Sequence, residues 1–132
     1  MTETYRFRVE KLIRDKLPAI MRASGLRVFE RTLEPGDFIK SLEAKLAEEA
    51  AEVAAAGDRE ERLDELADVM EVVLALARAH DFTPAELEAR RLAKRQARGG
   101  FDARVYNAAV EADEGCPALA YYLARPEAYP RL

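Results

Sequence analysis

The residues best suited to chemistry are four acids in mirror order about one short turn. They are Glu49, Glu52, Glu65 and Asp68, and the turn falls at Gly57-Asp58. The acids of each pair are three residues apart, so on a helix they share one face, roughly 4.5 Å apart along the axis. If the two segments are antiparallel helices, four negative charges meet and repel unless cations lie among them. The spacing therefore indicates a divalent metal site, and Mg²⁺ prefers such oxygen ligands.

The helical register directs these acids toward neighbouring helices. Glu49 lies on a stripe of apolar residues spaced by three or four, namely Leu42, Leu46 and Val53. Glu65 and Asp68 lead into a similar stripe, Val72 and Leu76. An ionised carboxylate on such a face is costly unless it is paired, and only Lys40 and Lys45 are nearby. The alternative, that the acids are ordinary solvated helix faces, stays open because glutamate is a good helix former.

The chain lacks the residues that other common metal sites need. A di-iron carboxylate bundle requires Glu-x-x-His motifs on two helices. The chain has one histidine, His80, and the residue three positions before it is Ala77. Cys116 is the only cysteine, which excludes an intrachain disulfide and a cysteine-rich metal site.

Apolar periodicity and helix-start signals predict four helices that would position the acids. They span about Val9 to Ala23, about Asp37 to Ala56, from a capping box at Asp58 and Glu61 to about His80, and from Thr83-Pro84 to before Gly99-Gly100. Pro18 permits a kink or a break in the first helix. Val28 to Leu33 could form a short strand that pairs with Val105 to Val110. The expected fold is an all-α helical bundle, with this small two-stranded β-element as an addition.

The composition favours one globular domain. The chain has 132 residues, is 49% hydrophobic and 35% charged, and carries a net charge of −4. We expect a single domain over residues 1–132, with a core at about 9–104 and an irregular tail at about 112–132. The acidic total disfavours nucleic-acid binding. No signal-peptide pattern and no apolar run of about 20 residues is present, so no membrane association and a cytoplasmic location are predicted.

Two acidic segments resemble a known signature. Glu48-Glu49-Ala50-Ala51-Glu52 and Glu65-Leu66-Ala67-Asp68 resemble the EExxE…ExxD motif of MazG-like all-α nucleoside triphosphate pyrophosphohydrolases. Lys11 to Pro18 and Arg98-Gly99-Gly100-Phe101 resemble a subgroup labelled phosphoribosyl-ATP pyrophosphohydrolase-like. The resemblance covers about residues 9 to 104, and the motifs in this order are more specific than the acids alone.

The resemblance implies an activity and a set of roles. The activity is Mg²⁺-dependent cleavage of a nucleoside triphosphate between the α and β phosphates, with Mn²⁺ as a substitute ion. By motif position, the metal ligands would be Glu49, Glu52, Glu65 and Asp68. Glu48 and Glu49 are the expected catalytic residues, Glu48 either as a further ligand or as the base that orients the attacking water. The resemblance also implies a homodimer or higher homo-oligomer with active sites near subunit contacts.

Basic residues flank the acidic centre and are expected to contact phosphates. They are Lys11, Arg14, Lys16, Lys94, Arg95, Arg98 and Arg104. For each of them a solvated surface charge is the alternative, and for Arg14 and Arg98 the motif position favours binding.

Three functions follow from these observations. The leading one is removal of unwanted or modified nucleoside triphosphates from the nucleotide pool. The second is phosphoribosyl-ATP pyrophosphohydrolase of histidine biosynthesis. The third, from another class, is a non-catalytic helical interaction module whose acids only keep it in solution.

Overall fold

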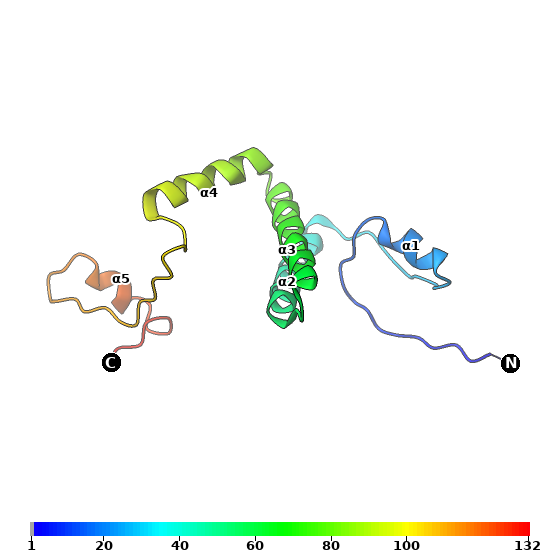
Figure 1. Ribbon diagram of the computed structural model, residues 1–132, viewed down its shortest axis with the longest axis horizontal. Helices are drawn as coiled ribbons and strands as arrows, with labels where there is room; N and C mark the ends of the chain where they lie inside the picture. The colour runs from blue at the N-terminus through cyan, green and yellow to red at the C-terminus, as the bar shows by residue number, and fades with distance from the viewer. Residues whose placement is uncertain (1) are drawn as a thin grey trace. The chain divides into compact units, whose positions relative to one another are not determined.

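The computed structural model describes residues 2–132, and its regular elements in that range are five helices (Figure 1). They are α1 (Leu17–Ala23), α2 (Pro35–Ala55), α3 (Arg59–Ala79), α4 (Pro84–Arg98) and α5 (Leu119–Leu123). The all-α class is confirmed. The chain divides into two compact units, one that ends at Lys94 and one that spans Arg95–Leu132. A single domain over the whole chain stays a prediction.

Helices α2 and α3 form the hairpin that the acidic pattern predicts, and they lie side by side (Figure 1). The Asp58 carboxylate accepts the backbone N–H of Glu61 at 2.8 Å. The Glu61 carboxylate in turn accepts the backbone N–H of Gly57 at 2.8 Å. Asp58 is thus the predicted N-cap, while Glu61 accepts the N–H of the residue before the cap instead of that of Asp58. A cap of this kind contributes about 1 kcal/mol to stability. It sets the start of α3 and hence the register of its acids against α2.

The packing of the hairpin follows the apolar stripes. Leu42 of α2 is 3% exposed and Val72 of α3 is 8% exposed, so both predicted stripes face inward. With Ala77, they are the only apolar residues that are buried among residues 2–132. The hairpin therefore has a very small core of its own. Among the same residues, none of the helices combines the length and hydropathy that crossing a membrane would take.

The first predicted helix is much shorter than expected. Val9 to Lys16 are not helical, and α1 begins at Leu17 with Pro18 in its first turn. Proline has no backbone N–H to donate and disfavours helical geometry in the residue before it, so it starts a helix far better than it continues one. This correction places Lys11 and Arg14 on an irregular segment instead of a helix.

The small β-element is also corrected. Neither Val28 to Leu33 nor Val105 to Val110 is a strand. A two-stranded ribbon is marginal in water, and β-forming composition alone does not supply a partner for it. The tail predicted to be irregular contains the short helix α5. The ring of Tyr122 in this helix lies 4.9 Å from the ring of Tyr129, measured between centroids.

Candidate functional site

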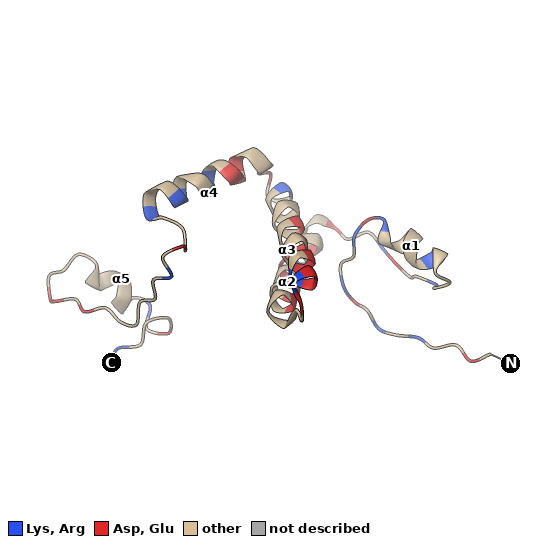
Figure 2. Cartoon of the chain, in the orientation of Figure 1, with Lys and Arg blue, Asp and Glu red and all other residues tan. Residues whose placement is uncertain are grey.

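The α2–α3 hairpin brings all five predicted acidic site residues together. Glu48, Glu49 and Glu52 of α2 each offer an oxygen within 4.8 Å of the others, and so do Glu49, Glu65 and Asp68 across the two helices. Figure 2 shows acidic residues along both helices. Glu49 belongs to both groups and is therefore the centre of the cluster.

Glu49 is the acid whose burial is most costly. Glu49 is 5% exposed, and its Oε2 atom has no hydrogen-bond partner among residues 2–132. Its Oε1 atom lies 3.4 Å from the Nζ atom of Lys45, one turn earlier on α2. Burial raises the pKa of Glu49, a hydrogen bond with Glu52 raises it further, and the Lys45 ammonium group opposes both. A carboxylate in this position is stabilised by any additional cation that reaches its free oxygen.

Glu65 of α3 also has a buried carboxylate oxygen, Oε2, without a hydrogen-bond partner among residues 2–132. A shared hydrogen bond with Glu52, then burial and the Glu52 charge, raise the pKa of Glu65 to about 7. The cluster thus holds either a proton or a cation near neutral pH.

The donor set fits a hard divalent cation. Five carboxylates supply oxygen ligands only, and two of them, Glu49 and Glu65, carry buried oxygens that have no hydrogen-bond donor in the described range. Mg²⁺ and Mn²⁺ both suit carboxylate and water ligands, and Mg²⁺ keeps part of its shell for waters or substrate phosphates. The assignment of individual acids as ligands stays a prediction.

The raised pKa of Glu65 predicts opposite pH effects on the bare protein and on metal binding. Because the folded-state pKa is about 7 and the ordinary value is 4.5, the protonated carboxyl contributes stability fully below pH 4.5. That contribution is lost as the pH rises through 7. We therefore expect the melting temperature in EDTA to fall between these pH values. Affinity for Mg²⁺ should rise over the same window, because the ion competes with the proton.

Melting curves in EDTA and calorimetric titrations of Mg²⁺ at pH 5.5, 6.5 and 7.5 measure both effects. Glu65→Gln removes the titrating group and should flatten the two profiles. A melting temperature in EDTA that is independent of pH for the unaltered protein would contradict this account of Glu65.

The irregular N-terminal segment contributes two of the predicted basic residues to the cluster. The Lys11 Nζ atom lies 3.1 Å from Glu48 Oε1, and the Arg14 Nη2 atom lies 2.5 Å from Asp68 Oδ1. Each pair joins residues that are distant in the sequence, across 37 and 54 positions respectively. The segment therefore lies against both helices of the hairpin through cations that contact carboxylates.

The five other predicted phosphate contacts are exposed residues. Arg95 pairs with Asp102, with 3.2 Å between Nη2 and Oδ2. The remaining four are exposed and form no ion pair with a residue of the described range: Lys16, Lys94, Arg98 and Arg104. Their roles as phosphate ligands stay predictions.

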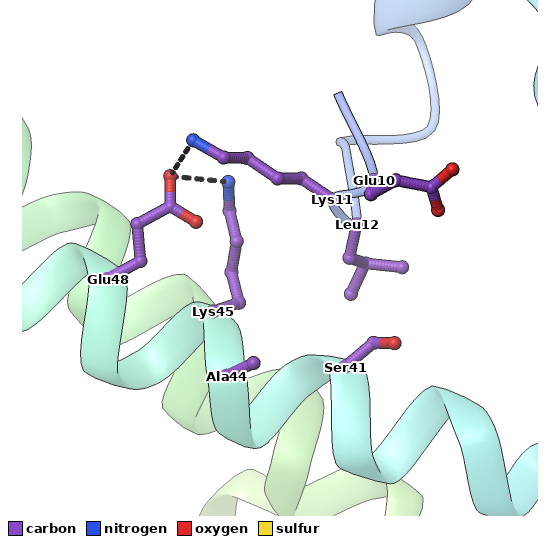
Figure 3. Close-up of a pocket in the computed structure, with 7 residues that line it drawn as sticks. All are labelled: Glu10, Lys11, Leu12, Ser41, Ala44, Lys45 and Glu48. Atoms are coloured by element: carbon purple, nitrogen blue, oxygen red, sulfur yellow. Dashed lines mark hydrogen bonds and ion pairs between the residues drawn. The ribbon is translucent and has the colours of Figure 1, made fainter. Parts of the chain in front are cut away.

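The structure adds residues to the site that the motifs do not include. Lys45, which the sequence places only near the acids, contacts both Glu48 and Glu49. A small pocket beside them has a volume of about 80 Å³ (Figure 3). It is lined by Glu10, Lys11, Leu12, Ser41, Ala44, Lys45 and Glu48. The signal for Lys45 was present in the sequence, because it precedes the two acids by three and four residues on one helix.

Comparison with known proteins gives one family and one curated relative. The sequence profile described as phosphoribosyl-ATP pyrophosphohydrolase matches residues 9–95, more than half of the 132-residue chain. An uncharacterized protein of Mycolicibacterium smegmatis is 43% identical over 54 residues, which are 41% of this chain and 55% of that protein. The match thus spans about half the length of that relative. No solved structure matches.

Proposed function

Because this chain belongs to the phosphoribosyl-ATP pyrophosphohydrolase family, we propose that it is a Mg²⁺-dependent hydrolase that cleaves nucleotides between the α and β phosphates. The match over residues 9–95 confirms the family resemblance and includes both acidic motifs and the segment from Lys11 to Pro18. The observation that carries the proposal is the buried oxygen of Glu49, which has no donor among residues 2–132 and faces acids of both helices. Such an arrangement is costly in a purely structural helix pair and useful in a cation site.

The acids divide into two roles in the proposed reaction. Glu49, Glu52, Glu65 and Asp68 would hold the metal, which neutralises phosphate charge and makes a bound water more acidic. Glu48 is more accessible than Glu49, with a side chain that is 27% exposed. We assign it as the base that takes the proton of the attacking water. The water oxygen bonds to the α phosphorus, the bond from that phosphorus to the bridging oxygen breaks, and pyrophosphate leaves with the bonding electrons.

Phosphate charge in the proposed reaction is met by the basic residues of the N-terminal segment. Lys11 and Arg14 already lie within contact distance of Glu48 and Asp68, so a phosphate bound among these acids would be within their reach. Guanidinium and ammonium groups form strong charge-assisted hydrogen bonds with phosphate oxygens. Further candidates for these contacts are Lys16, Lys94, Arg95, Arg98 and Arg104.

Two substrate classes are consistent with this chemistry. The leading proposal is house-cleaning of unwanted nucleoside triphosphates, with a nucleoside monophosphate and pyrophosphate as products. The description of the matching family favours a second candidate, phosphoribosyl-ATP in histidine biosynthesis.

An assay of the leaving group separates these readings. The protein is incubated with Mg²⁺ and either a panel of nucleoside triphosphates or phosphoribosyl-ATP, and the released anion is identified. Pyrophosphate from several triphosphates supports house-cleaning, whereas turnover of phosphoribosyl-ATP alone supports the second candidate. Absence of turnover together with no rise in melting temperature on addition of Mg²⁺ or Mn²⁺ would leave only a non-catalytic interaction module.

We also propose that the chain functions as a homodimer or a higher homo-oligomer. The support is the small number of buried apolar residues, three among residues 2–132. A further support is the exposed apolar residues of α3: Leu63, Leu66 and Met70. They follow one another by three and four residues and therefore form one stripe of that helix.

A further inference from the structure

The pocket beside Glu48 differs from the rest of the site because cations line it. It lies between residues 10–12 of the N-terminal segment and α2 (Figure 3). Lys11 and Lys45 reach toward its Glu48 end, and the Ser41 hydroxyl comes from the same face of α2. The volume, about 80 Å³, accommodates a few water-sized groups and is too small for a nucleoside.

Lys45 has an unusual position for a lysine. Its side chain is 21% exposed, and its Nζ atom lies 3.4 Å from Glu49 Oε1 and 3.9 Å from Glu48 Oε1. Lys11 approaches the same oxygen of Glu48 at 3.1 Å. Two ammonium groups therefore meet one carboxylate oxygen, although that oxygen carries only part of one negative charge. When a cation held by Glu49 neutralises that acid, Lys45 loses its nearer partner and becomes available to another anion.

We propose that this pocket is the subsite for a phosphoryl group of the leaving pyrophosphate, and that Lys45 moves from Glu49 to this group when the acids are neutralised. The inference rests on the metal-binding part of the proposed function. An ammonium group on a four-carbon stem has three donors and can turn between neighbouring acceptors. The pocket itself is lined by two cations and two acids, Glu10 and Glu48, and the release of Lys45 from Glu49 frees one positive charge in this lining.

The walls of the pocket agree with a phosphoryl ligand. Ser41 offers a hydroxyl donor, and Leu12 and Ala44 supply apolar surface. Ammonium groups form charge-assisted hydrogen bonds with phosphate oxygens. The pocket borders Glu48, which the proposed reaction uses as the base, so a phosphoryl group held there lies next to the reacting water.

Lys45→Met tests the proposal because it removes the charge and keeps most of the stem. With the charge gone, we expect Mg²⁺ to bind roughly 3- to 10-fold more tightly, since a neighbouring positive charge no longer opposes it. Inorganic pyrophosphate, titrated at saturating Mg²⁺, should bind roughly 10- to 100-fold more weakly, the loss of one charge-assisted contact. Both affinities are measured by calorimetry. Lys40→Met is the matched control, because Lys40 is an exposed lysine of the same helix that forms no ion pair with a described residue.

The opposite directions of the two shifts distinguish the proposal from a structural role. If Lys45 only supports the helix, Lys45→Met weakens Mg²⁺ and pyrophosphate binding together, and this result overturns the proposal. Equal affinities in Lys45→Met and Lys40→Met also overturn it, as does orthophosphate that binds as tightly as pyrophosphate. Lys45→Arg keeps the charge and should retain pyrophosphate binding; if Lys45→Met loses its helical circular dichroism, weak binding by Lys45→Arg overturns the proposal. An unaltered protein that binds no Mg²⁺ instead refutes the metal site of the proposed function.

Discussion

Glu49→Gln is expected to reduce nucleotide hydrolysis by more than about 100-fold and to leave the helical fold intact. Even the loss of a residue that only supports a metal ligand costs about 10- to 100-fold in affinity or activity, so the central acid of the cluster should cost more. The substitution keeps the shape of the side chain and removes the charge of a residue that is only 5% exposed. Without metal, the melting temperature should therefore hold or rise, because the buried charge is no longer present.

Two measurements, initial rates and melting curves with and without Mg²⁺, decide this prediction. The rise in melting temperature that Mg²⁺ produces in the unaltered protein should disappear in Glu49→Gln. Glu43→Gln is the control, because Glu43 is an exposed acid of the same helix. Full activity in Glu49→Gln, or an equal loss in Glu43→Gln, would show that Glu49 is not a metal ligand.

The acidic centre could be predicted from the sequence because its geometry is local. Two acids three residues apart share a helix face whatever the rest of the chain does, and the capping residues Asp58 and Glu61 set where α3 begins. These two facts are enough to bring Glu49 close to Glu65 and Asp68 once the hairpin closes.

The basic part of the site could be predicted only in composition. The contact between Arg14 and Asp68 joins residues 54 positions apart, and no local pattern specifies such a pair. The sequence also predicted a helix over Lys11, because the apolar spacing near Pro18 is helical in form. The proline instead starts α1, so the residues before it are free to lie against α2 and α3. The sequence predicted that Lys45 is near the acids. Its burial depends on tertiary packing, which residue spacing does not encode.

The exposed stripe on α3 gives the second large expected effect. Leu63, Leu66 and Met70 are 61%, 49% and 66% exposed, while the opposite face of the same helix carries Val72 against α2. Burial of one such side chain contributes about 1.5–3 kcal/mol, which a second copy of the chain would supply. The stripe therefore fits the proposed homo-oligomer, and its disruption should affect assembly and stability together.

Met70→Glu places a charge at the C-terminal end of the stripe. We expect its apparent mass by light scattering to fall to that of one chain, and its melting temperature to fall on the order of 10 °C. For the unaltered protein the melting temperature should rise with protein concentration, since assembly stabilises the folded state by mass action. Glu71→Gln, at an exposed residue next to Met70 but on another face, should change neither quantity. If the unaltered protein has the mass of one chain at every concentration and Met70→Glu melts at the same temperature, the stripe is not an interface, and the small core of the hairpin suffices by itself.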